Sequence, residues 1–126
     1  GKTPGPASSV LIVHDDSDML AFMARALSDA GYKVATARDG VEAVLHISKC
    51  GFDLIISDLK MPNLNGMQLV EIAAQKNMTT RFIMLSASKD EADEHKALEL
   101  GAIDYIRKPV RKEVLLLRVK KAFSCI

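Results

Sequence analysis

Four hydrophobic segments of this chain each end in polar residues that could bind a metal ion or a phosphate group. Asp58 is the most informative of these residues, because it directly follows the apolar run 53–57. The other three sets, in chain order, are His14-Asp15-Asp16 after run 10–13, Ser86-Ala87 after run 82–85, and Arg107-Lys108 after run 103–106. A short apolar run bounded by turn residues is typical of a buried strand. Open parallel sheets bind their ligands at the carboxyl ends of such strands.

Brought together, these side chains would form a site for a hard cation and a phosphoryl group. Carboxylates such as Asp15 and Asp58 are typical ligands of Mg²⁺, which completes its shell with carbonyl groups, water and substrate phosphate. The Lys108 ammonium group can bind phosphate oxygens as a point charge, and the Ser86 hydroxyl can donate a hydrogen bond to one of them. An isolated Asp58 would more simply cap the next helix, so the prediction depends on this convergence.

The spacing of apolar residues predicts five strands that alternate with five helices. The strands are expected at 10–13, 33–37, 53–57, 82–85 and 103–106, and the helices at 18–30, 40–49, 66–76, 88–100 and 110–123. Ser88 and Glu91 fit a capping box at the start of the fourth helix. Apolar strands joined by helical crossovers indicate an α/β fold with a single doubly wound five-stranded parallel sheet. The second strand suits a sheet edge, which predicts the flavodoxin-like order 2-1-3-4-5.

Composition excludes several classes of protein. A net charge of +1, with 26% charged residues, gives no electrostatic case for direct nucleic-acid binding. No apolar run is long enough to span a membrane, and no signal peptide is expected. The two cysteines, Cys50 and Cys125, match no metal or redox spacing. We therefore expect a cytoplasmic protein with one domain at residues 9–126, after a disordered lead or cloning remnant at residues 1–8.

From residue 10 to residue 123 the chain resembles the receiver domains of two-component response regulators. The matching pieces, in order, are Val10-Leu11-Ile12-Val13 ahead of Asp15, Asp58 with Met61-Pro62 and Asn65-Gly66, Ser86-Ala87, and Lys108-Pro109. Each piece is weak alone, but their order and spacing on this element pattern are specific. The resemblance implies a signalling domain, not an enzyme beyond its own phosphorylation and dephosphorylation. Asp58 would accept a phosphoryl group from a sensor histidine kinase or a phosphotransfer protein.

The same resemblance implies roles for the other residues of the site. The Mg²⁺ ligands would be Asp15, Asp58 and the backbone carbonyl of Lys60, with His14 as a further contact through water. Phosphate would be bound by Lys108, Ser86 and the backbone of Ala87, the switch residues would be Ser86 and Tyr105, and Lys60 and Ser88 would tune phosphate lifetime. The face formed by the fourth helix, last strand and last helix would change on phosphorylation. That face would contact a downstream effector domain or protein, and it is a candidate homodimer interface.

His14 departs from the family pattern, which usually has two acidic residues after the first strand. Alignment on Val13 places His14 at the first of these positions, and Asp16 lies one position too late to replace it. The histidine lowers the negative charge of the site and should weaken Mg²⁺ binding. Protonation below about pH 6.5 would repel the cation further, so Mg²⁺ affinity is expected to rise from pH 6 to pH 8. A mixed nitrogen and oxygen site would also favour Mn²⁺ as the alternative cation.

Two other readings of the sequence compete with a working receiver. A pseudo-receiver, an interaction module with impaired phosphorylation, is supported only by His14. An enzyme on the same sheet is the second rival. A flavodoxin would need a phosphate loop rich in Ser, Thr and Gly where this chain has His14-Asp15-Asp16. A phosphatase of the haloacid-dehalogenase type would need an acidic residue at the position of Lys60. Both enzyme readings are therefore poor.

Overall fold

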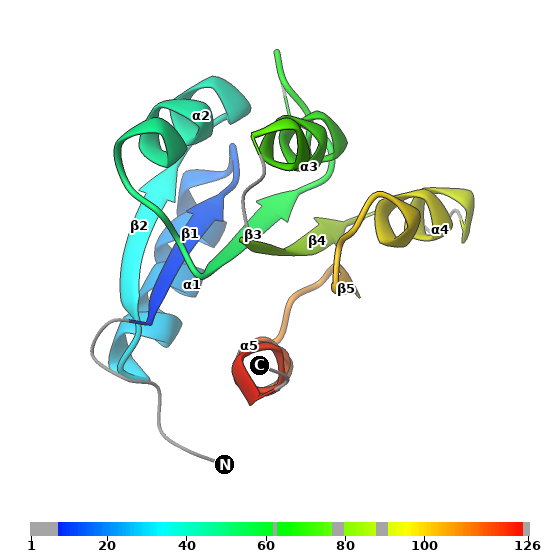
Figure 1. The fold of residues 1–126 in the computed structure, drawn as a ribbon. Helices are drawn as coiled ribbons and strands as arrows, with labels where there is room; N and C mark the ends of the chain where they lie inside the picture. Colours follow the sequence, from blue (N-terminus) through cyan, green and yellow to red (C-terminus); the bar gives the residue numbers. More distant parts are fainter. Residues whose placement is uncertain (1–7, 62, 77–79, 88–90, 125–126) are drawn as a thin grey trace.

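The computed structural model describes residues 8–61, 63–76, 80–87 and 91–124. Five parallel strands form one sheet in the order β2-β1-β3-β4-β5 (Figure 1). The strands are β1 (Ser9–Val13), β2 (Lys33–Ala37), β3 (Leu54–Asp58), β4 (Arg81–Ser86) and β5 (Asp104–Arg107). The helices are α1 (Ser17–Asp29), α2 (Gly40–Lys49), α3 (Gly66–Gln75), α4 (Glu91–Glu99) and α5 (Lys112–Ser124). The predicted fold class and strand order are confirmed.

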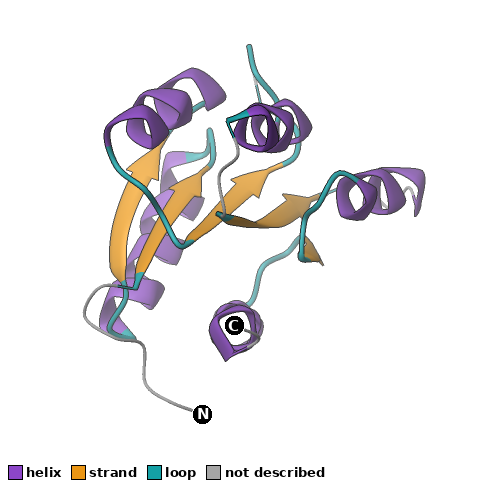
Figure 2. Ribbon diagram, in the orientation of Figure 1, coloured by secondary structure: helices purple, strands orange, loops and turns teal. Residues whose placement is uncertain are grey.

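Helices cover both faces of the sheet, which explains why the central strands are buried and mostly apolar (Figure 2). Helices α1 and α5 pack on one face, where Met23, Leu27 and Leu115 meet Ile12 and Ile56 of the strands. Helices α2, α3 and α4 cover the other face, where alternate strand residues such as Leu11 and Ile55 are buried. Side chains of successive strand residues point to opposite faces, so one strand contributes to both halves of the core.

Local sequence sets the ends of several helices. The Asp16 carboxylate caps α1 by accepting from the backbone N–H groups of Asp18 and Met19. Asn65 and Gln68 form a capping box at the start of α3, which was not predicted from the sequence. The capping box predicted at Ser88 lies outside the described residues, as does the predicted lead apart from Ser8. In the described part of the chain, every helix is too short or too polar to cross a bilayer.

Candidate functional site

Asp58 is the last residue of β3, so the predicted strand 53–57 lies one residue too early. Its side chain is buried, with the residue 5% exposed, and its Oδ1 lies 3.0 Å from the Nζ of Lys108. Immediately after Asp58 the chain stays attached to β4, because the backbone N–H of Leu59 donates to the carbonyl of Leu85 at 2.8 Å. The carboxylate is therefore held at the carboxyl end of the central strand.

Lys108 follows β5 and is held there by its own backbone. Its N–H donates to the carbonyl of Ser86 at 2.8 Å, which joins the ends of β4 and β5. The peptide bond from Lys108 to Pro109 is cis. A hollow of about 270 Å³ opens beside this pair and is lined by Asp58, Lys60, Ser86, Ala87 and Lys108. Four of these five lining residues were predicted to bind the phosphate or accept it, and the fifth, Lys60, was predicted at the cation.

His14 and Asp15 lie on the other side of the Asp58 carboxylate. His14 is only 3% exposed, and its backbone N–H donates to the carbonyl of Ala37 at 3.1 Å. Its Nε2 lies 3.7 Å from Oδ2 of Asp58, and its Nδ1 lies 3.5 Å from Oδ1 of Asp15. The Asp15 side chain is about half exposed, at 48%. The structure thus brings together His14, Asp15 and Asp58, as the sequence predicted.

Burial lowers the pKa of His14 below its ordinary value of 6.5. The negative charge of Asp58 opposes this shift, whereas the positive charge of Lys108 adds to it. The imidazole is therefore neutral at neutral pH, and its change of charge lies at lower pH than the sequence alone indicates. The expected rise of Mg²⁺ affinity with pH moves below pH 6.5 accordingly.

The oxygen atoms at this end of the sheet fit a hard divalent cation. One ligand atom each from His14, Asp15 and Asp58 all lie within 4.8 Å of one another. Mg²⁺ usually binds one or two carboxylates and keeps several of its waters. The pair of the buried Asp58 and the solvent-exposed Asp15 suits this ion. The Lys60 carbonyl remains a predicted ligand. The lifetime-tuning role predicted for Ser88 falls outside the described residues.

Tyr105 lies on β5, and its side chain points inward in this structure. The residue is 8% exposed, and its Oη is buried without a hydrogen-bond partner among the described residues. Its ring packs in the core layer under α2, α3 and α4. A buried hydroxyl without a hydrogen-bond partner costs free energy. A second conformation of Tyr105 in which Oη forms a hydrogen bond would remove this cost. The switching role itself remains a prediction.

Two contacts at the site were not predicted from the sequence. The backbone N–H of Asp16 donates to Nδ1 of His14 at 3.0 Å, which fixes the orientation of the imidazole. Gly66, the first residue of α3, approaches Asp58 so closely that a Cβ there would lie 2.7 Å from the Asp58 carbonyl oxygen. The sequence predicts Asn65-Gly66 as part of the family motif and as the start of a helix. A glycine eight residues after the strand end was the available signal for close backbone approach.

The strand order and the polar residues at the carboxyl ends of the strands are those expected of the receiver class. The model of the response regulator receiver domain family matches residues 10–120, and the chain belongs to this family. Receiver domains generally bind Mg²⁺ in an acidic pocket, which agrees with the cluster of His14, Asp15 and Asp58. The protein is therefore a response regulator receiver domain of two-component signal transduction.

Individual relatives agree with this assignment. The transcriptional regulatory protein PrrA of Mycobacterium tuberculosis is 40% identical over 111 residues, which cover 88% of this chain and 48% of PrrA. The response regulator SaeR of Staphylococcus aureus is 36% identical over 115 residues, or 91% of this chain and 50% of SaeR. The chain thus spans about half the length of these relatives.

Solved structures of receiver domains superpose closely on the chain. The receiver domain of the Francisella response regulator 1452 has a TM-score of 0.88 at 31% identity, and the match covers 93% of this chain and 97% of that one. The chemotaxis response regulator CheY4 of Vibrio cholerae has a TM-score of 0.86 at 31% identity, covering 92% and 98%.

The lowered pKa of His14 predicts an acid-dependent loss of stability. The folded state favours the neutral imidazole. The contribution of His14 to the free energy of unfolding is therefore fully present above its pKa in the unfolded chain, about 6.5. This contribution is lost as the pH falls through the lower pKa of His14 in the folded protein. Compared with His14→Gln, which does not titrate there, the parent should lose stability between pH 7.5 and pH 5. Urea unfolding of both proteins in metal-free buffer measures this difference. His95→Gln, on the exposed part of α4, is the control, and an equal effect of both substitutions would contradict the prediction.

Proposed function

We propose that Asp58 accepts a phosphoryl group from the phosphohistidine of a sensor histidine kinase or a phosphotransfer protein. One observation carries this proposal: the buried Asp58 carboxylate, with Oδ1 3.0 Å from Lys108 Nζ, borders a hollow of about 270 Å³ lined also by Ser86 and Ala87. A hollow lined by both a carboxylate and an ammonium group suits a tetrahedral anion that becomes bonded to the carboxylate.

The reaction is the transfer of a phosphoryl group from nitrogen to oxygen. An oxygen of Asp58 forms a bond to phosphorus, the bond from phosphorus to the histidine nitrogen breaks, and its electron pair returns to the leaving imidazole. Aspartyl phosphates of this kind are established products of carboxylate nucleophiles. Lys108 would hold a phosphoryl oxygen and offset its charge, while the Ser86 hydroxyl and the Ala87 backbone would bind the others.

A divalent cation held by Asp15, Asp58 and the Lys60 carbonyl would neutralise charge that develops on the transferring group. Mg²⁺ is the expected ion, with Mn²⁺ as the alternative. Asp15 contributes its charge from the solvent side, since its side chain is half exposed, whereas Asp58 is buried. The exposed Asp15 carboxylate would leave the cation a route to the site from solvent.

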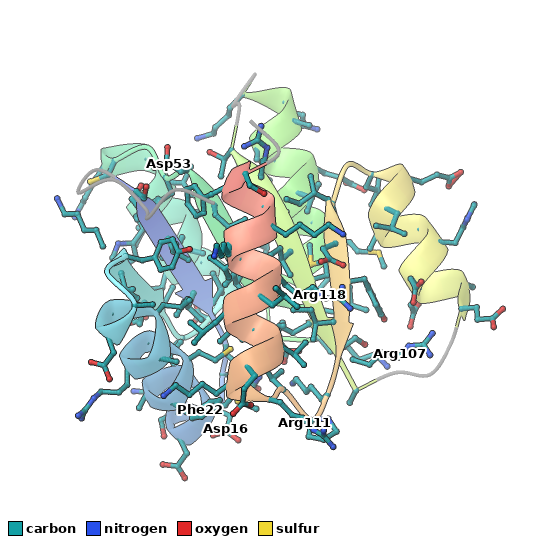
Figure 3. All side chains as sticks on the ribbon, turned by 90° about the horizontal axis from the view of Figure 1, so that it is seen from below. Asp16, Phe22, Asp53, Arg107, Arg111 and Arg118 are labelled. Carbon is teal, nitrogen blue, oxygen red and sulfur yellow. The ribbon has the colours of Figure 1, made fainter. Side chains whose placement is uncertain are left out.

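Phosphorylation would then change the face formed by α4, β5 and α5. Two ion pairs join these elements: Arg107 Nη2 lies 3.1 Å from Glu94 Oε1, and Arg118 Nη1 lies 2.6 Å from Asp104 Oδ1. Figure 3 shows Arg118 extending from α5 toward β5, and Arg107 on the side of α4. Among the described residues of these elements, the large exposed apolar side chains are Leu98 of α4 and Leu117 of α5, with Ile103 directly before β5. Ser86 lines the site and pairs with Arg107 of β5, and Tyr105 belongs to β5 itself, which suits a two-state element biased by local charge.

The partners of the domain follow from this reading. The phosphoryl donor would be a histidine kinase or a phosphotransfer protein. The downstream partner would be an effector domain or protein that contacts the face formed by α4, β5 and α5. A homodimer through the same face is a further expectation. We expect these events in the cytoplasm, without direct contact of this domain with nucleic acid or membrane, and without enzymatic activity beyond its own phosphorylation and dephosphorylation.

The direct test is the intact mass of the protein after incubation with acetyl phosphate and Mg²⁺. A gain of one phosphoryl group, absent when a chelator replaces the cation, is the expected result. No gain with Mg²⁺ or Mn²⁺ at any pH up to 8 would contradict the proposal and favour the pseudo-receiver. In that case the domain would serve as a binding module, and His14 would be the residue that accounts for the loss of phosphorylation.

A further inference from the structure

The Nε2 atom of His14 is a buried polar atom without a partner at the edge of the site. The residue is 3% exposed, and Nε2 has no hydrogen bond among the described residues. It faces Oδ2 of Asp58 at 3.7 Å, which is beyond hydrogen-bond distance. Leaving such an atom without a hydrogen bond costs free energy, so a hydrogen bond to Nε2 would stabilise the protein.

The other nitrogen of the ring determines what Nε2 can bind. The backbone N–H of Asp16 donates to Nδ1 at 3.0 Å, so the lone pair of Nδ1 is occupied. A neutral imidazole carries one proton and has one free lone pair. The proton of His14 is therefore on Nε2, and this nitrogen presents an N–H group to the site, not a lone pair. An N–H group cannot ligate a cation, and its positive end repels one.

The two oxygens of Asp58 face different groups. Oδ1 lies 3.0 Å from Nζ of Lys108, which lines the hollow together with Asp58, whereas Oδ2 faces His14, which does not line the hollow. A phosphoryl group that enters the hollow would therefore form its bond to Oδ1, the oxygen that is close to Lys108. Oδ2 would remain on the His14 side, and a displacement of less than about 1 Å would bring it within hydrogen-bond distance of Nε2.

We propose that His14 is a positioning residue that donates a hydrogen bond from Nε2 to Oδ2 of Asp58, and that it is not a ligand of the cation. The bond orients the carboxylate so that Oδ1 faces the hollow. It also places a partial positive charge where the family usually has a second carboxylate. The part of this inference that concerns phosphorylation rests on the proposed function, whereas the protonated state of Nε2 does not.

The position of the proton can be observed directly by NMR of protein with ¹⁵N-labelled imidazoles. The chain has three histidines, so His46→Gln and His95→Gln assign the signals. We expect a protonated Nε2 in His14 without metal, and the same state after addition of Mg²⁺. With Mg²⁺ and beryllium fluoride, a phosphoryl mimic, the Nε2 proton should shift downfield as the bond to Asp58 forms. A proton on Nδ1, or loss of the Nε2 proton on addition of Mg²⁺, would overturn the proposal.

Metal affinity separates a donor from a ligand. Mn²⁺ binds imidazole nitrogen more readily than Mg²⁺ does, so a His14 ligand would make Mn²⁺ binding sensitive to its removal. We expect His14→Leu to keep the Mn²⁺ affinity within about threefold of the parent, whereas Asp15→Asn should lower it by about tenfold or more. A tenfold loss in His14→Leu would overturn the proposal. Isothermal titration with each ion alone gives both values and needs no phosphorylation.

A conservative replacement tests the positioning role itself. The side-chain amide of Gln can donate from a position near that of Nε2, whereas Leu cannot. The rate of phosphorylation by acetyl phosphate at limiting Mg²⁺ should fall by about tenfold or more in His14→Leu and stay within about threefold of the parent in His14→Gln. Equal rates in Leu and Gln variants would overturn the role. If the parent takes no phosphoryl group, the proposed function fails instead, and the NMR and Mn²⁺ results still decide the state of His14.

Discussion

Asp58→Asn is expected to abolish the uptake of a phosphoryl group from acetyl phosphate. The amide has the shape of the carboxylate, but it lacks the anionic oxygen that would attack phosphorus, and it leaves Lys108 without the partner now at 3.0 Å. The loss should be complete within the detection limit of intact-mass measurement. Asp15 remains in place, so a loss of uptake would reflect the acceptor and not the removal of every carboxylate from the site.

Asp29→Asn is the matched control for this experiment. Asp29 ends α1 and forms an exposed ion pair with Arg25 at 3.3 Å, with both side chains largely in solvent. Exposed ion pairs contribute little to stability, so this variant should take up phosphate as the parent does. A phosphoryl group recovered on Asp58→Asn would contradict the assignment, and peptide mapping would then identify the true acceptor.

The fold could be predicted from the sequence because each element carried its own local pattern. Continuous apolar runs such as 54–56 and 82–85 indicate strands covered on both faces, and the more polar second strand indicates a sheet edge. The strand boundaries were predicted less well, since β3 lies one residue later than predicted. Asp58 belongs to β3, because its backbone pairs with Leu85 of β4, and pairing between distant segments leaves no mark on a local hydropathy pattern.

The membership of the site could also be predicted, because parallel strands place their carboxyl ends at one edge. Asp58, Ser86 and Lys108 line one hollow as expected, with His14 and Asp15 beside it. The pKa and the orientation of the His14 imidazole could not be predicted from the sequence. Its lowered pKa results from burial, and its orientation results from a backbone N–H two residues later. Both depend on how the first loop folds over the strand end, which residue types alone do not specify.

The close approach of α3 to the strand end gives the second large prediction, for Gly66→Ala. A Cβ at residue 66 would lie 2.7 Å from the carbonyl oxygen of Asp58 and 3.3 Å from Cα of Leu59. Both are backbone atoms held in place, since Gly66 N–H donates to the Leu59 carbonyl at 2.9 Å and Leu59 N–H donates to Leu85. The backbone cannot yield as a flexible side chain would, so the steric cost exceeds the helix propensity gained with alanine.

Gly66→Ala should therefore lower the free energy of unfolding by about 1–3 kcal/mol, the usual range for overpacking, and slow phosphoryl uptake by displacing the end of β3. Gly51→Ala is the matched control, because a Cβ there meets nothing within 4 Å. A surface change of this kind should alter stability by less than about 0.5 kcal/mol. Urea unfolding of both variants measures the difference. Equal midpoints would mean that α3 can move away from Asp58 without cost, and that the position of the acceptor does not depend on this contact.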